Sequence, residues 1–302
     1  MEGMPFADAL NLLTPLNDTA ALFLLIPYLA VAFFPHVAGE RARALPTWLR
    51  LTAPALLSIP YILVAFGSHV FRWEWFFLYA LLPVAVAVAL SQAAKKDPSQ
   101  TGTWIDFVAL AVLGLAVDLR WFERAWPAHL AIFNKILLLD AGIYGFLLVR
   151  RLEGVGFDLR LRLRDFGIGL REVAFYAPIA LALGLGLGFL HFHPRWPAPL
   201  HAAMAWFFTF FFIAMPEELF FRGWLQNLLE KRLGRYGALL LSACFFGLAH
   251  FNKRTAVFNW RYVILAAVAG LFYGRAWRRE RRVGASAITH ATVDTIWSLW
   301  LL

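Results

Sequence analysis

Long apolar segments recur along the chain, and each is long enough to cross a membrane as a helix. A hydrocarbon core of about 30 Å needs roughly 17 to 25 predominantly apolar residues in helical form. The chain is 61% hydrophobic and only 16% charged, which is more apolar surface than a soluble domain can bury. We therefore predict an all-α fold, a polytopic transmembrane helix bundle of about ten helices. The expected helices cover residues 19–38, 51–70, 75–93, 104–118, 130–149, 173–191, 200–229, 236–251, 261–277 and 284–302.

The basic residues are concentrated in alternate loops between these segments. The 28 Lys and Arg residues outnumber the 19 Asp and Glu residues, a net charge of +9 that taken alone would fit nucleic-acid binding. The alternation follows the positive-inside rule, so we expect the positive charge to reflect membrane topology, with the basic loops in the cytoplasm and the N-terminus outside. We therefore expect no nucleic-acid partner. The N-terminal residues lack a basic stretch followed by an apolar core, so we expect no cleaved signal peptide. The single cysteine, Cys244, excludes an internal disulfide and a Cys-rich metal site.

We expect two regions, divided near residue 172. Residues 1–172 form an N-terminal membrane-helix region that ends in a basic interfacial loop, and residues 1 to about 150 contain no constellation of polar groups. Leu and Arg alternate within residues 154–172, and a period of two is typical of a strand with one apolar and one cationic face. This loop either lies on anionic lipid headgroups or acts only as a topology signal. Residues 173–302 form a second membrane domain, which contains the candidate functional residues described next.

Ionisable residues cluster inside the expected helices of this second domain. A charge at bilayer depth costs at least about 2.5–3.5 kcal/mol, so such residues are candidates for function. The cluster consists of Glu217, Glu218, Arg222, His250, His290 and Asp294. Glu218 and Arg222 are four residues apart and share a helix face, so we expect them to form an ion pair. Glu217 is rotated by about 100° from Glu218, and we expect it to face a cavity as a general base.

These residues belong to three short motifs that occur in order on three expected helices. The motifs are Glu217-Glu218-x-x-x-Arg222 with Phe221, Gly223 and Leu225, then Phe246-Gly247-x-x-His250, then His290-x-x-x-Asp294. With these motifs the chain resembles the CPBP family of membrane proteases, which includes the type II CAAX prenyl endopeptidases. The resemblance covers about residues 204–298, roughly a third of the chain.

The resemblance implies a glutamate-type peptidase mechanism. Glu217 would deprotonate a water molecule with help from His250, and His290 and Asp294 would stabilise the oxyanion. Glu218, Arg222 and Phe246 would support these groups. The family pattern accepts Asn or Asp at the last motif position, but an ionised aspartate can only accept hydrogen bonds. We therefore expect Asp294 either to be protonated or to orient His290.

The resemblance also implies a substrate and a location. The substrate would be a membrane-anchored protein or peptide, in one case a prenylated CAAX protein, cleaved near its C-terminus. The chain would reside in the lipid bilayer of a bacterial inner (plasma) membrane. Glu217, His250, His290 and Asp294 are also acceptable ligands for Zn²⁺, which keeps a metal-dependent peptidase open. Because the HExxH spacing is missing, we favour chemistry without a metal or other cofactor.

Two functions from other classes stay open. Buried ionisable residues also form the proton relays of proton-coupled transporters. The chain lacks paired broken helices in its two halves, which disfavours a transporter. A non-catalytic membrane scaffold or immunity protein would instead tolerate Glu217→Gln, a change that should remove most of a peptidase's rate.

Overall fold

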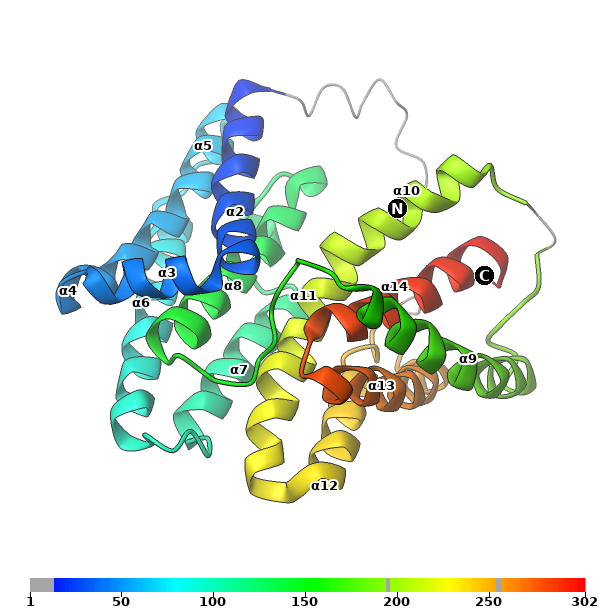
Figure 1. Cartoon of the computed structure of the whole chain (residues 1–302). Helices are drawn as coiled ribbons and strands as arrows, with labels where there is room; N and C mark the ends of the chain where they lie inside the picture. The colour runs from blue at the N-terminus through cyan, green and yellow to red at the C-terminus, as the bar shows by residue number, and fades with distance from the viewer. Residues whose placement is uncertain (1–13, 194–195, 254–256, 302) are drawn as a thin grey trace. The chain divides into compact units, whose positions relative to one another are not determined.

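The regular elements of this chain are all helices in the part that the structure describes. The computed structural model describes residues 14–193, 196–253 and 257–301 (Figure 1). The predicted all-α bundle is therefore confirmed. The chain divides into two packing units, which meet in the sequence between Leu152 and Glu153. The boundary expected near residue 172 falls inside a helix of the second unit, α9 (Leu163–Gly186).

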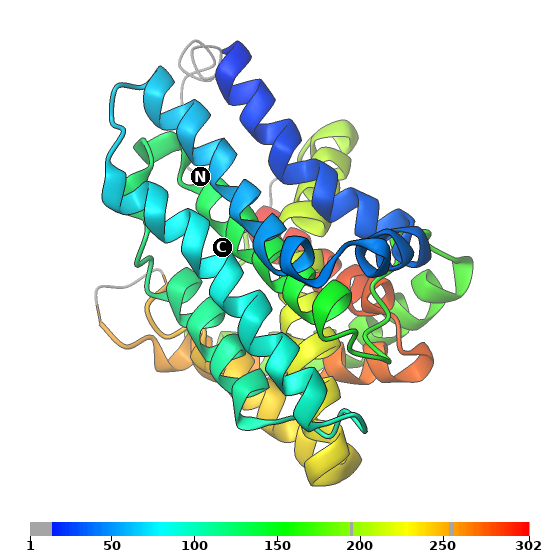
Figure 2. The same ribbon diagram turned by 90° about the vertical axis from the view of Figure 1, so that its left-hand side faces the viewer.

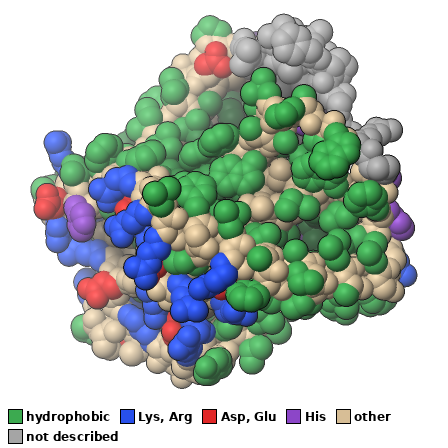
Figure 3. Space-filling model, turned by 45° about the vertical axis from the view of Figure 1, so that its right-hand side comes forward, with side chains coloured by type: hydrophobic (Ala, Val, Ile, Leu, Met, Phe, Trp, Pro, Cys, Tyr) green, Lys and Arg blue, Asp and Glu red, His purple; other side chains and the backbone are tan. Residues whose placement is uncertain are grey.

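Six helical stretches within the described residues are long and apolar enough to span a bilayer. They are Pro15–Phe33, Thr47–Gly67, Trp73–Lys96, Ala128–Val149, Leu163–Gly186 and Pro199–Leu248. Large hydrophobic side chains also remain exposed on these helices, and they cover most of the face drawn in Figure 3, where Lys and Arg gather in one part. Such a surface is stable only in contact with lipid, so the chain is an integral membrane protein.

Three expected helices exist but fall outside this set. Helix α7 (Trp104–Asp118) has 15 residues, and at 1.5 Å per residue it rises only about 22 Å, short of a hydrocarbon core of about 30 Å. Helices α13 (Trp260–Glu280) and α14 (Val283–Trp300) contain basic and site residues that lower their hydropathy.

The first unit is an assembly of helices packed around α2 and α6. Its elements are α2 (Pro15–Phe33), α3 (Pro35–Ala44), α4 (Thr47–Thr52), η1 (Ala53–Ser58), α5 (Ile59–Gly67), α6 (Trp73–Lys96), α7, η2 (Glu123–Ala125), η3 (Ala128–Leu130), α8 (Ile132–Ile143) and η4 (Tyr144–Val149). Helix α2 packs along α5 and α8, and α6 packs against η1 and η4. Figure 2 shows α2, α5 and α6 in blue to cyan.

A buried charge cluster ties the end of α6 to α7 and η4. Arg150 is 3% exposed, and its guanidinium bonds to Asp97 Oδ2 at 2.7 Å and to Asp106 Oδ1 at 2.9 Å. The expectation of no polar constellation in this region was wrong. Arg150 lies 44 positions after Asp106 and 53 positions after Asp97, so no short sequence motif indicates that these residues form a cluster.

The second unit surrounds the predicted site. Its elements are α9, α10 (Pro199–Thr209), η5 (Phe210–Ala214), α11 (Met215–Glu218), η6 (Leu219–Gln226), α12 (Asn227–Leu248), α13 and α14. Helix α9 packs on α13 and α14, and α12 packs on α13. The last contact is close, because a Cβ on Gly247 would lie 2.5 Å from the carbonyl oxygen of Val263. Glycine therefore permits the approach of α12 to α13 at the level of the site.

Helix α12 consists of two arms. Gly234 has φ 68° and ψ 178°, a conformation that glycine adopts readily and that interrupts the helix. Figure 1 shows the two arms meeting at a bend. The separate helices expected over residues 200–229 and 236–251 are therefore confirmed, although helical turns continue between them as far as the bend.

The segment before α9 is extended but is not a strand. Val155, Phe157 and Leu159 are buried in alternation, as a period of two predicts. However, no strand among the described residues lies beside their backbone. Trp277 Nε1 donates to Val155 O at 3.0 Å, and Val283 N donates to Gly156 O at 2.9 Å. The strand-like pattern therefore does not produce a strand here, because side chains and helix ends satisfy these carbonyl groups. Helix α9 begins at Leu163, ten residues earlier than expected.

Candidate active site

The two motif glutamates lie in a helix with widened turns. The predicted helix over residues 200–229 is continuous, but the π-helical turns η5 and η6 flank α11, which ends at Glu218. Pro216 lacks a backbone N–H and cannot donate to the preceding turn, which favours such an irregularity. π-helical turns are rare and occur frequently at functional sites.

Glu218 and Arg222 form the expected ion pair. Arg222 Nη1 donates to Glu218 Oε1 at 3.1 Å, and both side chains are fully buried. Arg222 Nη2 donates to the carbonyl oxygen of Gly270 at 3.0 Å, and the guanidinium carbon lies 4.5 Å from the centroid of the Phe246 ring. Three contacts of different kinds therefore hold the Arg222 side chain in place: the ion pair, a backbone hydrogen bond and a cation–π contact.

Glu218 has a second role that the sequence did not reveal. Its Oε1 atom lies 2.8 Å from His290 Nδ1, and Ser286 donates its hydroxyl to Oε2. A carboxylate only accepts hydrogen bonds, so His290 carries a proton on Nδ1. Ser286, His290 and Asp294 follow one another at intervals of four on α14 and share a face. That spacing was a signal for Ser286, which our sequence analysis missed.

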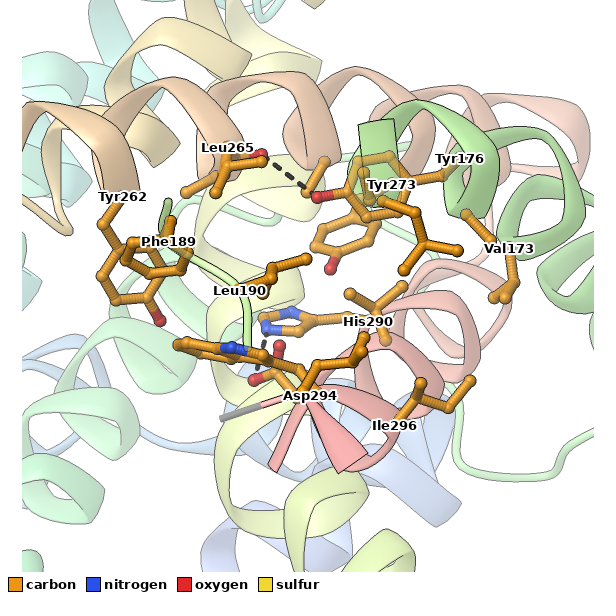
Figure 4. A pocket seen from close by; sticks show the side chains of 18 of the residues that line it. Val173, Tyr176, Phe189, Leu190, Tyr262, Leu265, Tyr273, His290, Asp294 and Ile296 are labelled. Atoms are coloured by element: carbon orange, nitrogen blue, oxygen red, sulfur yellow. Dashed lines mark hydrogen bonds and ion pairs between the residues drawn. The ribbon is translucent and has the colours of Figure 1, made fainter. Parts of the chain in front are cut away.

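His290 lies among three carboxylates. Its Nε2 atom lies 3.4 Å from Asp294 Oδ2 and 3.9 Å from Glu217 Oε2, while Nδ1 faces Glu218 (Figure 4 shows His290 with Asp294). The Tyr273 ring stacks on the imidazole at a centroid distance of 4.7 Å and an angle of 15°. Both ring nitrogens thus face acceptors, and a protonated ring can donate on either side.

His250 lies just beyond the end of α12. Its Nδ1 atom lies 2.8 Å from the carbonyl oxygen of Phe246, one turn earlier in the chain. Because a carbonyl can only accept, Nδ1 carries the proton, and the neutral ring has its lone pair on Nε2. The ring packs against Phe246 at 4.9 Å and against Tyr262 at 4.7 Å, which leaves little freedom of rotation. His250 is therefore oriented to accept a proton or a hydrogen bond through Nε2.

His250, His290 and Asp294 line one cavity. It encloses about 130 Å³, enough for several water molecules, and its other walls are mostly apolar, with Tyr176, Leu190 and Ile296 among the side chains drawn in Figure 4. Glu217 is not part of this lining, in contrast to our expectation that it faces a cavity. Its carboxylate lies instead beside His290, and 28% of its side chain stays accessible.

The described residues do not assemble a metal site in this geometry. No group of three His, Cys, Asp or Glu side chains within them lies close enough to share an ion. The Nδ1 atoms of His250 and His290 already face Phe246 O and Glu218 Oε1, so only their Nε2 atoms remain available as ligands. Zn²⁺ dependence therefore remains to be tested by the zinc content of the purified protein.

The comparisons with known proteins agree with the motifs. Residues 199–296 match the family model described as Rce1-like, type II CAAX prenyl endopeptidase Rce1-like. Searches of curated proteins and of solved structures found no match for the chain. The matched range runs from α10 into α14 and contains all three motifs. Residues 199–296 are therefore similar to the type II CAAX prenyl endopeptidases, and this match supports an intramembrane protease of the CPBP family.

Proposed function

We propose that this protein is a glutamate-type endopeptidase of the bacterial inner membrane. Its substrate is a membrane-anchored protein or peptide, for example a prenylated CAAX protein, and it cleaves this substrate near the C-terminus. The family match supports a membrane endopeptidase. The observation that carries the mechanism is the convergence of Glu217 and Asp294 on His290 Nε2, beside the cavity that His250 also lines.

Glu217 is the base in this mechanism. A water molecule between its carboxylate and His250 Nε2 can donate one proton to Glu217 while its second proton forms a hydrogen bond to the histidine. The water oxygen bonds to the scissile carbonyl carbon, and the carbonyl π electrons move to the oxygen. When this intermediate collapses, the C–N bond breaks and Glu217 returns the proton to the leaving amine.

His290 is the oxyanion donor. Its Nδ1–H is engaged by Glu218, so the ring presents Nε2–H on the side of Glu217 and Asp294. An oxyanion that forms there accepts from Nε2 as charge develops. Asp294 accepts from the same nitrogen at 3.4 Å before substrate arrives, which favours an orienting role for Asp294 over a donor role.

Cleavage of C-terminal tail peptides in reconstituted vesicles tests this proposal. Lipidated and unlipidated tails would be offered to the wild type and to Glu217→Gln, and zinc content and activity after chelation would be measured on the same preparation. General-base catalysis contributes about 10²–10⁴-fold, so we expect Glu217→Gln to lose at least about 100-fold in cleavage rate.

Glu280→Gln is the matched control, because Glu280 lies in the same unit and pairs with the exposed Arg164, away from the motifs. It should cleave like the wild type. Equal cleavage of every tail by the wild type and Glu217→Gln would reject Glu217 as the base. Absence of cleavage in both would favour the scaffold function.

A further inference from the structure

Ser286 is a buried hydroxyl that the three motifs do not include. It is 0% exposed and lies on α14 one turn before His290. Its oxygen contacts Glu218 Oε2 and lies 2.9 Å from the carbonyl oxygen of Tyr273. A serine hydroxyl has one proton to donate, and both neighbours are acceptors. The ionised carboxylate is the stronger acceptor, so the proton is held mainly by Glu218.

Each oxygen of Glu218 has its own donors. Oε1 accepts from Arg222 Nη1 and faces His290 Nδ1, whereas Oε2 accepts from Ser286. The terminal torsion of a glutamate is broad, so donors rather than rotamer preference must set the plane of this carboxylate. Without Ser286, Oε2 has no remaining donor among the hydrogen bonds of the described residues, and only the contacts at Oε1, from Arg222 and His290, still orient the carboxylate.

Tyr273 connects Ser286 to the other face of the imidazole. Its ring stacks on His290 at 4.7 Å, and its carbonyl oxygen lies within hydrogen-bonding distance of Ser286. Through Tyr273, helix α13 therefore contacts both Ser286 and His290 on α14. Ser286 thus contacts both of the groups that determine where the His290 ring points, Glu218 through its edge and Tyr273 through its face.

We propose that Ser286 is a positioning residue: it fixes the Glu218 carboxylate in the orientation that holds His290 with Nδ1–H engaged and Nε2 directed at the reacting group. This inference rests on the proposed function of His290 as oxyanion donor. Ser286 does not touch substrate or the reacting atoms; it acts through Glu218 and His290.

Thr289 provides a matched control on the same helix. It is also fully buried, and its hydroxyl bonds to the carbonyl oxygens of Gly169 and Ala285, away from Glu218. Loss of supporting contacts typically reduces activity about 10–100-fold, so we expect Ser286→Ala to lower kcat by that factor with KM changed less than about twofold. Thr289→Val should leave kcat within about twofold of the wild type.

A double variant separates positioning from a general loss of packing. In a Glu218→Gln background, Ser286→Ala should lower kcat by less than about threefold, because the group that Ser286 holds is already altered. If Ser286→Ala and Thr289→Val lower kcat equally, or if Ser286→Ala keeps its full effect in that background, Ser286 is not a positioning residue.

A spectroscopic readout tests the inference without any substrate. The protein would be labelled with ¹⁵N-histidine in nanodiscs, and the His290 signals assigned by their loss in His290→Gln. We expect a low-field, slowly exchanging Nδ1–H signal in the wild type and in Thr289→Val, and its broadening or upfield shift in Ser286→Ala. An unchanged His290 signal in Ser286→Ala would overturn the proposal, whereas a failure of Glu217 in catalysis would appear only in the cleavage assay.

Discussion

Removal of the Arg222 charge should destabilise the second unit strongly. Arg222→Met keeps an unbranched stem of similar length but loses the ion pair with Glu218, the bond to Gly270 O and the guanidinium contact with Phe246. Breaking a buried ion pair by removing one partner costs about 3–5 kcal/mol, because the other charge is left buried without compensation. Glu218 retains Ser286 and His290 as donors, so we expect the lower end, about 3 kcal/mol.

This loss should be visible as a lower melting temperature. For a folding unit of about 150 residues, 1 kcal/mol corresponds to about 2–4 °C, so Arg222→Met should melt about 6–12 °C below the wild type. Thermal unfolding in nanodiscs, followed by intrinsic tryptophan fluorescence and by the fraction that stays monodisperse after heating, measures this shift. Arg222→Lys keeps the charge but loses the planar contacts, so its melting temperature should lie between those of the wild type and Arg222→Met.

The double variant Glu218→Gln/Arg222→Met tests the reasoning behind the magnitude. If the unpaired carboxylate is the cause, neutralising it should recover part of the loss, so that the double variant is more stable than the sum of the single effects predicts. A melting temperature of Arg222→Met within about 2 °C of the wild type would refute the argument from the buried pair.

Two further predictions concern the role of Asp294 in cleavage and the contribution of Asp97 to stability. Asp294→Asn should retain cleavage, because an amide can still accept from His290 Nε2, whereas Asp294→Ala should weaken it; complete loss in the Asn variant, measured with the tail peptides, would contradict the orienting role. In the first unit, burial by itself raises the pKa of Asp97 above 3.8, but hydrogen bonds from Thr101 and Gly102 outweigh it and lower the pKa to about 2. The stabilisation from this carboxylate is therefore present in full above about pH 4 and lost as pH falls toward 2, so Asp97→Asn should be less stable at pH 7 and show a flatter decline of melting temperature between about pH 4 and pH 2. Parallel declines in the two proteins would be the contrary result.

Local sequence patterns were sufficient for the elements and for part of the site. Apolar segments of bilayer length predicted most of the helices, because burial in lipid requires backbone groups to be paired within each segment. A spacing of four predicted the Glu218–Arg222 pair, since residues four apart on a helix are neighbours whatever surrounds them. The alternation of Leu and Arg favoured an extended segment within residues 154–172, but it could not show that α9 begins at Leu163 or that, among the described residues, no strand pairs with the extended part.

Composition, the lengths of the apolar segments and the motif spacing thus predicted the membrane class, the helical elements and the charged residues of the candidate site. Which of these residues come into contact depends on how the helices pack against one another in three dimensions. Glu218 and His290 are 72 positions apart, and their contact depends on how α11 packs against α14. The stacking of Tyr273 on His290 depends in the same way on α13. Contacts between helices depend on side-chain packing along whole interfaces, which no local spacing encodes.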